Sequence, residues 1–172
     1  MNALHYKLSA VGAAIAYAIS AVPVIGHQIP DSHWGTRGAV VDGAGAAAFL
    51  LTAAALAGLA SMLADGRVAR WATRTAQAGS VGMATESVVS LVHGGTVLGG
   101  LFLGGLAAAV TGLVTLGVAG LRAGRLSWAA GLPALGLLVG IAGGDRGGFL
   151  VTAVTWLVLG TLGAERPVPA VA

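Results

Sequence analysis

The stretch that decides the fold is Gly79–Gly95, GSVGMATESVVSLVHGG. Wound as a helix at about 100° per residue, it places Glu86 on one stripe with Ser90 and His93. The other members of that stripe are Gly79, Gly82 and Met83. The opposite side carries Val81, Ala84, Val88, Leu91 and Val92. We therefore expect a helix with one face toward lipid and one polar face toward the rest of the protein.

The composition around this stretch is that of a membrane protein. The chain has 172 residues, of which 56% are hydrophobic and only 9% are charged, and its mean hydropathy is +0.89. A soluble domain carries about 25% charged residues. The sequence therefore predicts an all-α, polytopic integral membrane protein whose first partner is the lipid bilayer. Its bias toward Ala, Gly, Val, Leu and Arg is typical of GC-rich bacteria.

Charge and motif content exclude several classes of function. The nine basic and six acidic residues lie mostly between apolar runs, and no basic cluster with interleaved aromatic residues suggests a nucleic acid partner. The chain has no cysteine, which excludes disulfides, iron–sulfur clusters and thiol catalysis. It also contains no nucleophile elbow, phosphate-binding loop or zinc-protease motif.

The apolar runs predict a compact bundle of about six transmembrane helices in one domain, residues 1–164, followed by a short disordered tail, residues 165–172. The expected spans are 8–25, 39–64, 78–92, 97–121, 126–142 and 149–163. From Ala78 to Leu121 the only charged residue is Glu86. One helix of that length would measure about 66 Å, twice the hydrocarbon thickness, so we place a turn at His93–Thr96. Five or four spans are the alternatives, because the third and sixth runs are short.

The basic residues indicate the orientation. With the N-terminus inside, most of them fall on inner segments and only Arg37 and Arg146 on outer ones. The inner set is Lys7, Arg67, Arg70, Arg74, Arg122, Arg125 and Arg166. This asymmetry predicts a protein of the inner (plasma) membrane with both termini in the cytoplasm.

Small residues indicate how the spans pack. Two stripes at four-residue spacing allow helix backbones to approach closely, either within the chain or in a homo-oligomer or larger membrane complex. The first is Gly12, Ala16 and Ser20, and the second is Gly100, Gly104, Ala108 and Gly112. Pro133 predicts a kink in the fifth span. Asp42 is expected to cap the second helix or to meet its positive N-terminal end.

Glu86 is the strongest candidate for a functional residue, because an acid in mid-membrane is costly unless it is paired, protonated or hydrated. Ser90, His93 and Asp42 join it as candidates for a proton, ion or substrate pathway. The alternative is that Glu86 serves packing alone, held by a serine or a backbone group.

The longest polar connection, HQIPDSHWGTRGAVV, adds His27, Asp31 and His33 as outer-loop candidates. They would share an outward-facing vestibule with His93 and Glu86. Imidazole and carboxylate groups suit Zn, Ni or Cu, but this spacing matches no closed site. We assign neither a metal nor a cofactor.

The sequence favours a transporter- or channel-like protein with Glu86 as its proton- or cation-responsive group. The second hypothesis is a non-catalytic subunit or assembly partner of a larger membrane complex. The third is a membrane-embedded enzyme acting on a lipid or isoprenoid, with Glu86 and His93 as acid and base. Because no catalytic motif is present, an enzyme is the less favoured reading.

Overall fold

The computed structural model describes residues 3–25, 35–63, 66–123 and 132–162. Within those ranges the chain is all-helical and has no strand, which confirms the predicted class. The α-helices are α1 (Ala3–Ala21), α2 (Thr36–Leu63), α3 (Arg67–His93), α4 (Gly99–Arg122), α5 (Leu132–Ala142) and α6 (Phe149–Leu162). Two 3₁₀ turns, η1 (Val22–Val24) and η3 (Gly144–Arg146), follow α1 and α5.

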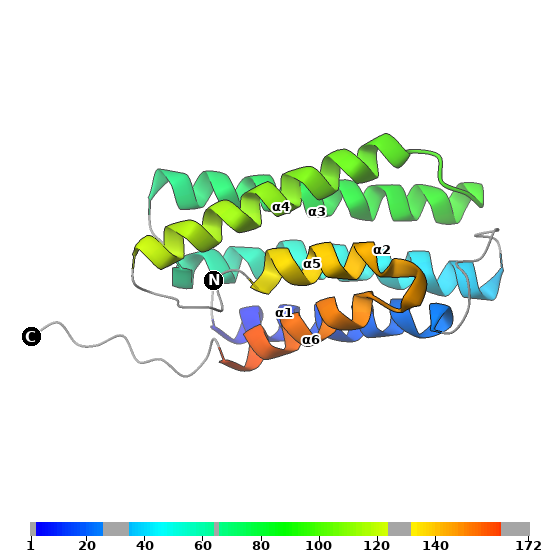
Figure 1. The fold of residues 1–172 in the computed structure, drawn as a ribbon, viewed down its shortest axis with the longest axis horizontal. Coiled ribbons are helices and arrows are strands. Elements are labelled where there is room, and N and C mark those ends of the chain that lie inside the picture. The colour runs from blue at the N-terminus through cyan, green and yellow to red at the C-terminus, as the bar shows by residue number, and fades with distance from the viewer. Residues whose placement is uncertain (1–2, 26–34, 64–65, 124–131, 163–172) are drawn as a thin grey trace, which may run out of the picture.

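Consecutive helices run antiparallel, so that α1 begins and α6 ends at the same end of the bundle (Figure 1). Each helix packs against the next one in the chain, and α6 returns to pack against α1. The six helices therefore form a closed ring. Its weakest joint lies between α5 and α4, since α5 packs mainly on α6.

Aromatic side chains fill the middle of this ring. Tyr17 of α1 stacks on Phe149 of α6 with ring centroids 5.6 Å apart. Phe49 of α2 meets Tyr17 edge-on at 5.7 Å and Phe102 of α4 at 6.3 Å. The cluster thus contains all three phenylalanines of the chain together with Tyr17. Because they come from four helices that are distant in sequence, this cluster fixes how the helices are arranged.

The α3 and α4 backbones approach each other through small residues. The carbonyl oxygen of Gly79 lies only 2.8 Å from the position that a Cβ on Gly105 would occupy. A Cβ on Gly112 would lie 2.5 Å from the carbonyl oxygen of Ala72. Ala109, between these two glycines, is fully buried. Close packing of the fourth span is therefore confirmed.

The predicted stripe on that span does not face α3, and its role between copies of the chain or toward another protein stays a prediction. Gly100 and Gly104 have no atom within 4 Å of their would-be Cβ positions. Only Gly112 of the predicted set is buried, because the glycine opposite Gly79 is Gly105 and this contact sets the rotation of α4.

The stripe on α1 behaves as expected within the chain. A Cβ on Gly12 would meet Leu51 of α2 at 3.3 Å. Ser20 donates a hydrogen bond of 3.0 Å to the carbonyl oxygen of Val41, also on α2. This face of α1 is therefore occupied by α2.

Three segments are long and apolar enough to cross a membrane, namely Leu4–Val24, Thr36–Ala60 and Gly99–Arg122. The described parts of α5 and α6 have 11 and 14 residues, which at 1.5 Å per residue is roughly 16–21 Å, compared with about 30 Å for a bilayer core. The class of helical membrane protein is supported, whereas the six-span bundle is not confirmed.

The helix that contains the third predicted span, 78–92, begins earlier, at Arg67. Residues 67–77, which separate the second and third predicted spans, are therefore helical. Arginine is a good helix former, so charge lowers the hydropathy of this segment without breaking the helix. The helix α3 is not among the helices that are long and apolar enough to span a membrane.

One expectation about helix starts stays a prediction and one is corrected. Pro133 is the second residue of the described part of α5, and the kink expected there stays a prediction. The rest of the predicted fifth span, residues 126–131, lies outside the described residues. Asp42 does not cap α2, since that helix begins at Thr36 and has no acidic residue in its first turn.

The turn between the third and fourth runs is confirmed. Gly94 ends α3 in the left-handed conformation with φ 71°, and its amide donates to the carbonyl oxygen of Ser90 at 2.8 Å. The amide of Gly95 donates to the same oxygen at 3.2 Å. Glycine is favoured in this conformation because it has no Cβ.

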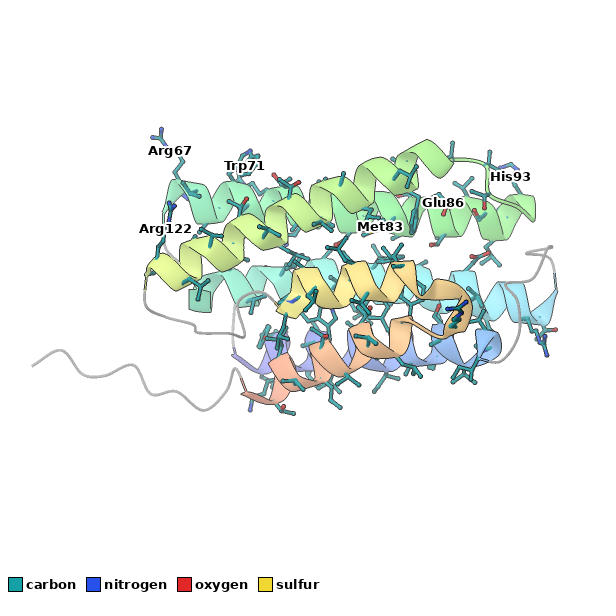
Figure 2. All side chains as sticks on the ribbon, viewed as in Figure 1. Arg67, Trp71, Met83, Glu86, His93 and Arg122 are labelled. Atoms are coloured by element: carbon teal, nitrogen blue, oxygen red, sulfur yellow. The ribbon has the colours of Figure 1, made fainter. Side chains whose placement is uncertain are left out.

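The outside of the ring is apolar, as expected for contact with lipid. Leu8, Val92 and Val154 expose at least 60% of their surface, and soluble proteins seldom present such continuous apolar surface. Arg67 and Arg122 lie at the end of the bundle opposite His93 (Figure 2). The membrane type and the cytoplasmic location of the termini stay predictions.

Candidate functional site

The buried acid of α3 is held by its own helix. Glu86 exposes 7% of its surface and Ser90 only 1%. Their i, i+4 spacing places them on one face, and the Ser90 hydroxyl donates to Oε1 of Glu86 at 2.6 Å. The carbonyl oxygen of Ser90 also accepts the amides of Gly94 and Gly95. Ser90 therefore ties Glu86 to the end of the helix.

Glu86 lines a cleft of about 340 Å³. The other lining residues are Thr96 in the α3–α4 turn and, from the first turns of α4, Gly99, Phe102 and Leu103. The site lies in the half of the bundle that ends at His93, where the start of α4 slants away from α5 (Figures 1 and 2). The loose α4–α5 joint of the ring leaves room for it.

On the side toward Arg67 the cleft has a closed floor. Met83 lies almost one turn before Glu86 and is fully buried. A Cβ on Gly105 of α4 would meet the Met83 side chain at 3.1 Å. Next along α3 comes the backbone contact between Gly79 and Gly105. On its outer side the cleft borders Leu103 of α4, which exposes 66% of its surface.

The cleft combines one carboxyl group with mostly apolar walls. Thr96 adds a hydroxyl group, and Phe102 adds an aromatic ring that also belongs to the central cluster. Away from water, a carboxylate attracts a cation more strongly than it does in bulk solvent. The same group is neutral when it holds a proton.

The remaining predicted residues of the transmembrane part are not brought into this cleft. His93 is exposed at the end of α3, and it is absent from the cleft wall as far as the structure describes it. Asp42 of α2 is buried, with 8% of its surface exposed, and it too is outside the described wall. It has an interaction partner of its own.

The predicted outer-loop residues, His27, Asp31 and His33, lie outside the described residues. Within the described ranges, no group of three or more His, Cys, Asp or Glu residues could hold a metal ion.

Sequence reasoning missed a second polar junction, where α1, α2 and α3 meet. A Cβ on Gly45 of α2 would lie 3.6 Å from the Ser20 hydroxyl and 3.9 Å from that of Ser87. Ser87 directly follows Glu86 but faces α2, so adjacent residues of α3 present polar groups to two different helices.

Reasoning from the sequence also missed Thr96 and Phe102 as lining residues. For Phe102 a signal was available, since it is the only aromatic residue of the predicted fourth span.

No family model, curated protein or solved structure matches the chain. Function is therefore inferred from the chemistry and geometry of the cleft.

Proposed function

We propose that the chain is a small transporter- or channel-like membrane protein in which Glu86 takes up a proton or a monovalent cation. The observation that carries this proposal is a buried carboxyl group that lines a cleft with mostly apolar walls. Ionisable groups within membrane helices are rare and typically mark ion or proton pathways.

The cleft favours this proposal over a purely structural role for Glu86. A packing role is satisfied by the hydrogen bond from Ser90 alone and needs no open volume beside the acid. The structure has both the hydrogen bond and the volume. Ser90 and Thr96 would extend the polar path from Glu86 toward the His93 end.

The closed floor suggests a carrier that exposes Glu86 to one side at a time. To reach the other side, a cation must pass Met83 and the contact between Gly79 and Gly105. Movement at the lightly packed joint between α4 and α5 would change access to Glu86 without breaking the tight α3–α4 contact.

Proton uptake by reconstituted protein tests the proposal. Liposomes containing the full chain and an internal pH-sensitive dye are given an inside-negative potential with potassium and valinomycin. We expect faster acidification than in protein-free liposomes, reduced to that background by Glu86→Gln. The matched control is Val88→Ala on the exposed side of α3, which keeps the wild-type rate.

The same assay tests whether other titratable or charged groups near the His93 end of the bundle contribute to proton uptake. Those whose side chains the structure describes are Arg37 and Asp42 on α2, His93 on α3 and Arg146 on η3. Asp42→Asn and His93→Gln are expected to retain flux that depends on Glu86. A wild-type rate no higher than background, or equal rates in wild type and Glu86→Gln, would refute the proposal.

One observation favours the subunit hypothesis as a second candidate. Gly100 and Gly104 form an exposed small-residue face on α4 with open space above both glycines, which is a typical surface for a second transmembrane helix. If Gly104→Leu leaves the size of the complex in a mild detergent unchanged, this candidate loses its support. The enzyme hypothesis has no comparable observation, because neither His93 nor Asp42 joins Glu86 in the described cleft wall.

A further inference from the structure

We infer that the cleft at Glu86 takes an organic ammonium ion that carries an apolar substituent. The inference rests on the proposed function and names the substrate class of the same site. It follows from three properties of the cleft, namely its volume, the single acid in its wall, and the aromatic and aliphatic groups beside that acid.

The volume is larger than an exchanged proton requires. A cleft of about 340 Å³ falls at the lower end of the range for small-molecule sites, about 300–1,000 Å³. Gly99 lines this space without a side chain. The cleft therefore has room for an organic molecule of modest size.

The wall is poor in the ligands that a bare inorganic cation needs. A hard cation such as Ca²⁺ takes about 6–8 oxygen atoms. Among the described lining residues, only Glu86 and Thr96 offer side-chain oxygen atoms. The Ser90 hydroxyl is already committed to Glu86. An ammonium ion with alkyl groups is weakly hydrated and needs one counter-charge rather than a full oxygen shell.

Phe102 and Leu103 offer an aromatic and an apolar surface for the substituent of such an ion. The Phe102 ring lies in the same wall as the Glu86 carboxyl group, and an aromatic face attracts ammonium ions by a cation–π interaction. Leu103 exposes 66% of its surface, so it connects the cleft with the apolar outside of α4. An apolar substituent can lie on Leu103 while the ammonium group stays between Glu86 and Phe102.

Calorimetric titration of the full-length protein in detergent tests the inference with four probes. Benzyltrimethylammonium carries both the charge and the apolar group, whereas tetramethylammonium and potassium lack the apolar group and benzyl alcohol lacks the charge. We expect benzyltrimethylammonium to bind and tetramethylammonium to bind at least about 10-fold more weakly. Potassium and benzyl alcohol are expected to give no saturable heat.

Two variants test whether benzyltrimethylammonium binds at the residues that line the cleft. Glu86→Gln, which keeps the shape and removes the charge, is expected to weaken benzyltrimethylammonium binding by about 10-fold or more. Phe102→Leu, which keeps an apolar side chain and removes the ring, should weaken it by about 2- to 30-fold. Val88→Ala again serves as the control and is expected to bind as the wild type does.

Each outcome decides the inference. Absence of saturable binding, equal affinity for benzyltrimethylammonium and tetramethylammonium, or unchanged affinity in Glu86→Gln would overturn it. If Glu86→Gln fails to fold, Phe102→Leu and the four probes decide instead. Should the organic ion not bind while proton uptake still depends on Glu86, the inference is wrong and the proposed function stands. Binding through Glu86 without any flux would support the inference and refute the transport function.

Discussion

The contact between α3 and α4 predicts that a single methyl group at Gly79 destabilises the protein. A Cβ there would lie 2.9 Å from the Cα atom of Ala109 and closer still to the carbonyl oxygen of Gly105. Ordinary contacts begin at 3.4 Å, so the two helices must separate by at least 0.5 Å (3.4 minus 2.9). Both obstacles are backbone atoms, which cannot turn away as a flexible side chain can.

Gly82 provides the matched control for Gly79→Ala. It lies on the same helix, and a Cβ there would meet the Cα atom of Gly105 at 3.6 Å, an ordinary contact. Each variant gains about 1 kcal/mol of helix propensity, so the gain cancels between them. Overpacking costs about 1–3 kcal/mol, and we expect Gly79→Ala to be less stable than Gly82→Ala by that amount.

The free energy of unfolding is measured in mixed micelles by titration with sodium dodecyl sulfate, followed by circular dichroism. Equal unfolding free energies for Gly79→Ala and Gly82→Ala would refute the close α3–α4 contact. A Gly82→Ala variant that is itself less stable than wild type would refute the rotation of α3 relative to α4.

Three further predictions concern the ring of helices, each measured in the same unfolding assay. Tyr6→Phe removes a buried hydrogen bond of 3.1 Å to an α6 backbone carbonyl and is expected to cost about 1 kcal/mol; no loss would contradict the α1–α6 contact. Thr152→Val removes a bond from α6 to the α5 backbone and should cost about as much. Thr155→Val is its control, since that hydroxyl bonds within α6, and equal losses would contradict the α5–α6 joint. Phe49→Ala empties the aromatic cluster and is expected to cost about 3–5 kcal/mol, whereas a loss below about 1 kcal/mol would place Phe49 outside the core.

The parts of the fold that depend on local sequence could be predicted. The turn at His93–Thr96 followed from the length of the apolar run and from two adjacent glycines. The shared face of Glu86 and Ser90 followed from their i, i+4 spacing, which any helix obeys.

The parts that depend on which helices meet could not be predicted. A single helical stripe describes a helix with one neighbour, but α3 packs against both α2 and α4. Its buried surface is therefore wider, and Ala84, expected on the lipid side, is buried with 2% of its surface exposed. The rotation of α4 likewise depends on Gly79 of another helix, so Gly105 could not be preferred to Gly104 from the spacing on α4 alone.

Hydropathy also misplaced element boundaries, since it measures affinity for lipid rather than helix formation. The helix α3 continues through its arginines. The cleft itself needed the turn, the start of α4 and the middle of α3 to be placed together, which no single segment reveals.

Labelling of Glu86→Cys by a membrane-impermeant thiol reagent tests the central claim most directly. The chain has no cysteine of its own, so any reaction reports the introduced thiol. Reagent is added to one side of oriented liposomes or to the other. His93→Cys marks the open end, and Met83→Cys, at a fully buried position, marks the closed floor.

We expect Glu86→Cys to react from the same side as His93→Cys. Met83→Cys should stay unreactive from either side. A Glu86→Cys variant as inert as Met83→Cys would mean that the acid is sealed in the bundle and serves packing alone, which would contradict the account.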